Sequence, residues 1–169
     1  MSQLESRDRH SKFIELISYL AVIFAVPAFF VQQYYDRESK RVEAALQLLQ
    51  FANSPEYSVT LQRLSKPWEN VDVGALLSQR LSANALAKFR IDSTKSVQNA
   101  DIEQISDLYR IVISCRDKHV CDRGVIDDNF HAPVKQFYCS YRERLTLISR
   151  RLNRPDYSST ISRYVGSCE

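Results

Sequence analysis

Four cysteines are the side chains of this sequence that could form covalent bonds with one another, and they permit three disulfide pairings. Cys115 and Cys121 flank a short charged loop, so a bridge between them would close that turn. Cys139 and Cys168 each lie about 14 residues from a turn at 153–154, and two antiparallel helices would bring them level. We therefore predict the disulfides Cys115–Cys121 and Cys139–Cys168.

The state of these thiols also bears on the compartment of the domain. Disulfides persist in oxidising surroundings, so the predicted pairs place the C-terminal domain in the periplasm or outside the cell. Two alternatives stay open, namely four free buried thiols in a cytosolic domain and a zinc site. The C-x3-H-x-C spacing of such a zinc site matches no usual zinc knuckle. Its candidate ligands are Cys115, His119, Cys121, and either His131 or Cys139.

Histidine 131 is the candidate for general acid–base chemistry, because it follows a pair of acidic residues. In that interpretation His131 would be a base oriented by Asp127 or Asp128. The sequence offers no paired nucleophile, and an acidic run before a proline is typical of a capped, solvated turn. We therefore assign no catalytic residue and expect a protein that is not an enzyme.

Composition excludes other classes of function. The sequence has only three glycines, Gly74, Gly124 and Gly166, and their positions exclude the glycine-rich phosphate-binding motifs. The net charge of +3 is too small to indicate a nucleic-acid partner. Scarce glycine with abundant leucine, alanine, glutamine and arginine favours helices. We expect no cofactor, no metal and an all-α fold.

An apolar segment near the N-terminus predicts a membrane anchor. From Phe13 to Tyr35 the sequence reads FIELISYLAVIFAVPAFFVQQYY, without a charge between Leu16 and Val31. Roughly 20 apolar residues are enough for a helix to cross the hydrocarbon of a bilayer. We predict a polar tail over 1–12 and a single transmembrane helix over 13–35. The alternatives are a cleaved signal peptide, which lacks a clean A-x-A site here, and a buried soluble helix.

Two residues of this segment favour a partner within the membrane. Glu15 is a carboxylate one turn inside the span, where it either reaches back to water or contacts another subunit. Pro27 removes a backbone donor and is expected to kink the helix, a defect that a neighbouring helix can repair. Basic residues flank both ends of the span equally, so charge does not set the orientation.

The remainder of the chain, over 36–169, predicts a small bundle of about five helices that continues from the anchor. Helices are expected over 55–65, over 72–90, from 101, from 133 and over 155–165, with a short piece over 122–129. Residues 91–100 are polar and predict a loop. Single-sided apolar stripes, such as Ile102, Ile105, Tyr109 and Val112, indicate that the helices pack into one core.

Four residues are candidates for contacts with a partner or with anionic lipid headgroups. Trp68 follows Pro67 in a predicted loop and is a candidate exposed anchor residue. The others belong to a basic stretch that could meet headgroups or an acidic partner, although a solvated helix face is the alternative. They are Arg142, Arg150 and Arg151.

The segments LYRIVISCRDKHVCD, FYCSYRERL, RPDY and the terminal GSC lie between Ser106 and Cys168. With the anchor and the following RESKRVEAALQLLQF, they resemble an uncharacterised family of bacterial single-pass membrane proteins with a helical domain of unknown function. The resemblance implies an architecture, and it transfers no functional residue. We expect the chain to lie in the bacterial inner membrane.

Our leading functional hypothesis is therefore a non-enzymatic, membrane-anchored interaction module, an accessory subunit or scaffold of a larger membrane complex. It depends on Glu15, on Pro27, on the helix that continues out of the membrane and on the absence of a catalytic motif. The alternative is a membrane-anchored sensor that binds a small ligand within the helical bundle.

Overall fold

The computed structural model describes residues 2–69, 71, 82–154 and 156–168, with the side chains of 2–23, 83 and 156 left outside the description. Over these residues the chain is helical and has no strand, which confirms the all-α prediction. The helices are α1 (Ser2–Ala52), α2 (Pro55–Ser65), α4 (Ala83–Ser93), α5 (Asn99–Asp117), α6 (Arg123–Arg151) and α7 (Asp156–Val165), with a 3₁₀ turn, η1 (Lys66–Trp68).

The chain divides into two compact units, Met1–Lys40 and Arg41–Glu169. The first unit is formed by α1, which continues through Pro27 without a break. Within the part of the chain whose side chains are described, no helix has the length and hydropathy needed to cross a membrane. Residues 13–23 of the predicted span, Glu15 among them, lie outside that part.

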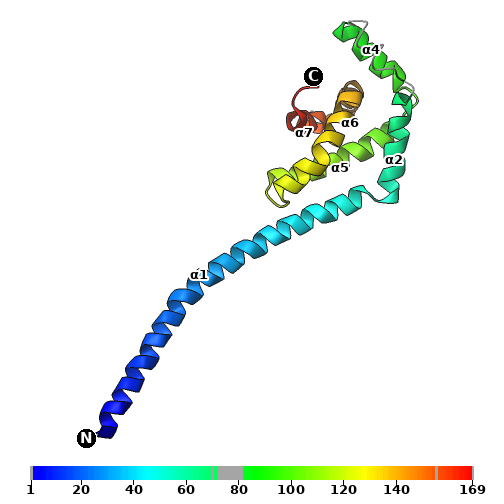
Figure 1. Cartoon of the computed structure of the whole chain (residues 1–169). Coiled ribbons are helices and arrows are strands. Elements are labelled where there is room, and N and C mark those ends of the chain that lie inside the picture. The colour runs from blue at the N-terminus through cyan, green and yellow to red at the C-terminus, as the bar shows by residue number, and fades with distance from the viewer. Residues whose placement is uncertain (1, 70, 72–81, 155, 169) are drawn as a thin grey trace. The chain divides into compact units, whose positions relative to one another are not determined.

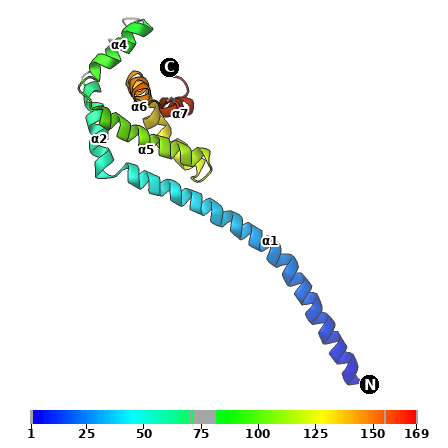
Figure 2. The ribbon, with the colours of Figure 1, turned by 180° about the vertical axis from the view of Figure 1, so that it is seen from behind.

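The second unit is a helical bundle around one apolar core. Helices α5, α6 and α7 pack against one another, while α2 contacts α5 and α4 contacts α6 (Figures 1 and 2). The predicted stripe of α5 points inward, since Ile102, Ile105, Tyr109 and Val112 are all buried. Tyr157, Ile161 and Val165 bring the inner face of α7 into the same core.

Helix α6 corrects the prediction of two separate elements before and after Pro133. It runs unbroken from Arg123 to Arg151, with Pro133 in its interior. An interior proline costs about 3 kcal/mol, but the buried stripe continues on both sides of it at helical spacing. Burying each large apolar side chain contributes about 1.5–3 kcal/mol, so the stripe outweighs the proline. Its members are Ile126, Phe130, Val134, Phe137, Tyr141, Leu145 and Ile148.

The connection between α4 and α5 is shorter than predicted. Residues 91–93 belong to α4 and α5 already begins at Asn99, so only part of the predicted 91–100 loop is a loop. The segment is held from α6 by Arg144, which donates to the carbonyl oxygens of Thr94 at 2.8 Å and Val97 at 3.2 Å. Arg144 also donates to the Asn99 side chain. Residues 72–81, where a helix was expected to begin, lie outside the description.

Both predicted disulfides are present. Cys115 and Cys121 are bonded with their Cα atoms 5.2 Å apart, closing the turn between α5 and α6. Cys139 and Cys168 are bonded with a Cα separation of 5.6 Å, which ties the end of the chain to α6. The four cysteines are therefore all paired.

Candidate functional site

An aromatic pocket between α2, η1, α5 and α6 is a cavity in the described part of the bundle that could hold a ligand. Its volume is about 230 Å³. Its walls are mainly apolar or aromatic, and polar side chains come from Ser65, Gln136 and Ser140. The remaining lining residues are Leu61, Leu64, Trp68, Tyr109, Pro133, Phe137 and Tyr141. Helix α6 contributes most of one wall because Pro133, Phe137 and Tyr141 follow one another at helical spacing.

The pocket is braced by a hydrogen-bond chain that starts at Trp68. The Trp68 Nε1–H donates to the Tyr141 hydroxyl oxygen at 3.3 Å, and the Tyr141 hydroxyl donates to the Leu64 carbonyl oxygen at 2.5 Å. Burial raises the pKa of Tyr141, so its hydroxyl keeps its proton and donates throughout the physiological range. This chain links η1 and the end of α2 to α6.

The aromatic rings of the pocket pack edge to face. The Trp68 and Tyr141 ring centroids are 6.2 Å apart at an interplanar angle of 89°, and those of Trp68 and Phe89 are 6.5 Å apart. Tyr109 and Phe137 make a similar contact at 5.4 Å. Burial raises the pKa of Tyr109 to about 12, so this ring too stays neutral. The pocket therefore has aromatic walls without ionised groups.

Polar side chains attach α2, one wall of the pocket, to α5. Gln104 donates to the Glu56 carboxylate at 2.8 Å and lies 3.1 Å from the Thr60 hydroxyl. Arg63 approaches the buried Asp101 carboxylate at 3.3 Å and donates to Thr60 at 3.2 Å. We call these five residues the α2–α5 clasp. It satisfies polar groups that burial would otherwise leave without partners.

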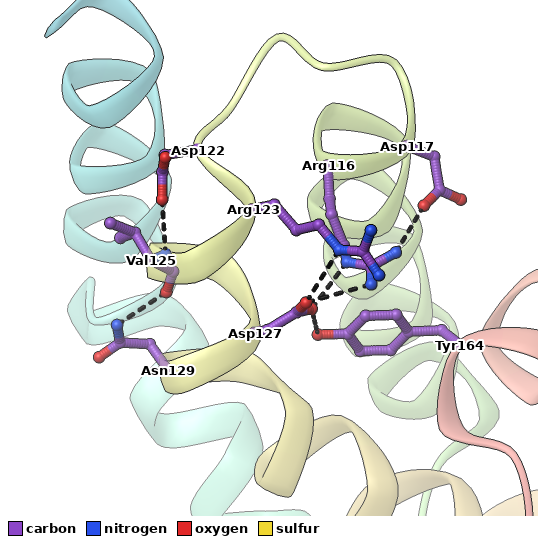
Figure 3. Close-up of polar contacts among 8 residues, drawn as sticks. All are labelled: Arg116, Asp117, Asp122, Arg123, Val125, Asp127, Asn129 and Tyr164. Carbon is purple, nitrogen blue, oxygen red and sulfur yellow. Dashed lines mark hydrogen bonds and ion pairs between the residues drawn. The ribbon is translucent and has the colours of Figure 1, made fainter. Parts of the chain in front are cut away.

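A second polar cluster joins α5, α6 and α7 (Figure 3). Asp127 accepts two hydrogen bonds from Arg116, at 2.7 Å and 3.1 Å, and one from the Tyr164 hydroxyl at 3.0 Å. Arg123 approaches the same carboxylate at 3.5 Å. The Arg116 guanidinium also lies 5.1 Å from the centre of the Tyr164 ring. This bidentate geometry is typical of a structural ion pair.

The electrostatics of this cluster are those of a satisfied carboxylate. Burial acts to raise the pKa of Asp127, but the hydrogen bonds from Arg116 and Tyr164 outweigh it, and the pKa lies below its usual value. The Asp127 hydrogen bond correspondingly raises the pKa of Arg116. The cluster therefore stabilises the junction of three helices.

Of the two carboxylates considered as partners of His131, Asp127 instead binds Arg116 and Tyr164. His131 is exposed and its ring contacts the Tyr164 ring at 5.6 Å. The alternative zinc site is excluded at the cysteines because both pairs are disulfides. Across the described residues no group of candidate ligands could hold a metal ion.

The basic residues proposed as an interface divide into two groups. Arg142 donates to Glu143 at 2.9 Å, and Arg151 pairs with Glu103 across the bundle, so both are partly engaged within the domain. Arg150 is exposed on α6. The three side chains therefore do not form one uncommitted patch.

Trp68 corrects the expectation of an exposed anchor residue in a loop. It ends η1, is half-buried and forms part of the aromatic pocket. The sequence predicted Tyr109 and Tyr141 on the apolar faces of two different helices, but it did not indicate that Trp68 packs between them. Gln136 and Ser140 lie four residues apart on α6, next to its apolar face. This spacing could have indicated polar side chains at the edge of a pocket.

Comparison of the chain with family models, with curated proteins and with solved structures found no match. The resemblance to a family of single-pass membrane proteins therefore stays a prediction.

Proposed function

We propose that this chain is a non-enzymatic module anchored in the bacterial inner membrane by residues 13–35. Its helical domain serves as an accessory subunit or scaffold of a larger membrane complex. The bilayer and other membrane subunits are its partners, and the domain lies on the periplasmic side.

The distribution of apolar side chains around α1 carries this proposal. Seven large apolar residues between Phe24 and Tyr35 are 51–70% exposed. At roughly 100° per residue they spread over about two thirds of the helix circumference instead of along one stripe, and Ala25, Ala28 and Gln32 occupy the remaining third. A helix with large apolar side chains over most of its circumference requires an apolar environment on most sides, which a bilayer provides and a single soluble partner does not. The residues are Phe24, Val26, Phe29, Phe30, Val31, Tyr34 and Tyr35.

The two disulfides support the periplasmic orientation. Reducing systems in the cytosol keep most thiols free, whereas paired cysteines persist in the periplasm. Because the flanking charges are equal on both sides of the span, the disulfides are the feature that distinguishes the two orientations.

Topology can be tested with two introduced thiols and a membrane-impermeant maleimide in spheroplasts. Thr146 is exposed on α6, so Thr146→Cys should label in intact spheroplasts without a reductant. The matched variant Ser6→Cys, in the predicted N-terminal tail, should label only after lysis. Labelling of Thr146→Cys only after lysis would refute the periplasmic placement, and release of the full chain by alkaline carbonate would refute the anchor.

Partnership needs its own experiment. A tagged full-length chain, solubilised in a mild detergent from native membranes, should migrate above its monomer mass and retain at least one other membrane protein. Glu15→Gln should weaken that retention, because an intramembrane carboxylate without a partner is costly. Glu38→Gln, outside the predicted span, is the control and should leave the retention unchanged. A lone monomer that retains nothing would contradict the accessory-subunit proposal.

A second candidate function, ligand sensing by the anchored domain, is favoured by the aromatic pocket. Ligand sites are typically concave, mostly apolar and furnished with a few polar groups. The pocket has this composition, and Ser65, Gln136 and Ser140 supply the polar groups. A rise in the melting temperature of the domain with a small molecule would support this function.

A further inference from the structure

We infer that the aromatic pocket binds a neutral amphiphile, with one six-membered apolar ring inside and a hydroxyl or amide group at the mouth. This inference rests on the second candidate function and names the chemical class of its ligand. It does not depend on the anchor or on a protein partner.

The size of the pocket sets the size of the apolar part. A cavity of about 150 Å³ with apolar walls holds one benzene ring. The pocket has about 230 Å³, which leaves space for one ring and a small substituent. Edge-to-face contacts hold the aromatic side chains in place, so the walls are formed before a ligand arrives.

The charge of the lining sets the charge of the ligand. The described residues that line the pocket include no aspartate, glutamate, lysine or arginine. Its tyrosines stay protonated, because burial raises the pKa of Tyr109 to about 12 and also raises the pKa of Tyr141. An ionised ligand would lose its hydration there without gaining a counter-ion, which is costly. The pocket therefore selects neutral molecules.

The polar edge sets the position of the head group. Inside the pocket the Tyr141 hydroxyl already donates to the Leu64 carbonyl and accepts from Trp68, so it is engaged by the fold. Gln136 and Ser140 lie one turn apart on α6, and Gln136 is exposed at the edge. Their amide and hydroxyl can both donate and accept hydrogen bonds. A ligand hydroxyl or amide placed there keeps its hydrogen bonds while the ring is buried.

Trp68 makes the binding directly measurable, because it is the only tryptophan of the chain and lines the pocket. The full-length protein in lipid nanodiscs would be titrated with cyclohexanol while Trp68 fluorescence is followed. Cyclohexanecarboxylate and cyclohexylammonium are matched charged probes, and empty nanodiscs correct for partition into lipid. We expect saturable binding of cyclohexanol with a Kd on the order of 1 mM, consistent with the free energy available to so small a ligand.

Variants separate the pocket from the rest of the surface. Ser140→Phe places a ring in the pocket and should weaken cyclohexanol binding at least about tenfold. Thr146 is an exposed residue of α6 outside the pocket lining, so the control variant Thr146→Phe should change the binding less than about twofold. Gln136→Ala changes an exposed side chain. It should weaken cyclohexanol binding several-fold but leave methylcyclohexane binding unchanged, because it removes only the head-group contact.

The inference is overturned by any of three results. They are the absence of a saturable fluorescence change, equal or tighter binding of either charged probe, and equal effects of Ser140→Phe and Thr146→Phe. Tighter binding of cyclohexylammonium would identify the aromatic walls as a cation site instead. None of these results bears on membrane insertion or on copurification, so failure of the ligand class is distinguishable from failure of the anchored-module proposal.

Discussion

Removal of the two disulfides should destabilise the domain by different and predictable amounts. A disulfide restricts the unfolded chain in proportion to the logarithm of the loop that it closes. The bonded cysteines are 29 residues apart for Cys139–Cys168 and 6 apart for Cys115–Cys121. The loop-entropy relation then assigns about 3.6 kcal/mol to the first bridge and about 2.2 kcal/mol to the second, a difference of about 1.4 kcal/mol.

The measurement compares two double variants, Cys139→Ala with Cys168→Ala, and Cys115→Ala with Cys121→Ala. Paired replacement avoids a free thiol that could form new bridges. Urea unfolding of the full chain in nanodiscs, followed by Trp68 fluorescence, gives the free energy of unfolding of each variant. A larger loss for the short loop, or equal losses, would refute the reasoning from the unfolded chain. Such a result would mean that contacts in the folded state dominate, for example around the buried Cys121.

Three further changes test individual contacts by equilibrium unfolding. Tyr141→Phe leaves the Leu64 carbonyl without its donor, so it should lower the free energy of unfolding by about 1–3 kcal/mol; no loss would contradict the bracing role. Asp127→Asn should cost about 1 kcal/mol at neutral pH. The pKa of Asp127 in the folded protein is below its unfolded value of 3.8. The wild type should therefore be more stable than the variant above pH 3.8, and this difference in free energy of unfolding should disappear as the pH falls further. A difference that grows in acid would contradict the ion pair with Arg116. Pro133→Ala should stabilise α6 by up to about 3 kcal/mol, since it restores a backbone donor. A loss of stability would contradict this and would show that the contacts of the proline ring in the pocket wall outweigh the missing donor.

Helices could be predicted from the sequence wherever apolar residues recur at helical spacing and polar residues occupy the opposite face. The helix over 55–65 agrees with α2, and the predicted stripe of α5 is buried, although Leu108, which is buried beside it, was not recognised. The Cys139–Cys168 pair followed from the fixed rise of a helix per residue, whereas the Cys115–Cys121 pair followed from the short charged loop between the two cysteines. Helical periodicity thus predicted several of the elements and one of the two covalent links.

The errors arose where tertiary packing overrides local preference. Pro133 reads as the start of a helix in isolation, yet the stripe from Phe130 to Phe137 crosses it without a change of period. Thr94 and Val97 read as part of a polar loop, but both are buried and their carbonyls are held by Arg144 from a distant part of the chain. Such contacts depend on which helices become neighbours, and no local pattern records that.

The pocket was missed for a related reason. It draws on α2, η1, α5 and α6, so its residues are separated by tens of positions and no single segment shows it. Trp68 was seen only as an aromatic residue beside a proline. Its partner Tyr141 is 73 residues later in the chain, and their contact is a property of the assembled bundle.

The positions of the two disulfides indicate which wall of the pocket can move. The disulfides connect α5 to the start of α6 and α6 to the end of the chain, and neither reaches α2. Helix α2 is held by the α2–α5 clasp, by buried Leu64 and by the bond from Tyr141. These contacts can open locally at a lower free energy than a cross-linked segment. A ligand that spans α2 and α6 would add contacts only to the closed form, so cyclohexanol should slow amide hydrogen exchange in α2 while leaving α7 unchanged. Equal slowing in both helices would show that the whole bundle opens as one unit.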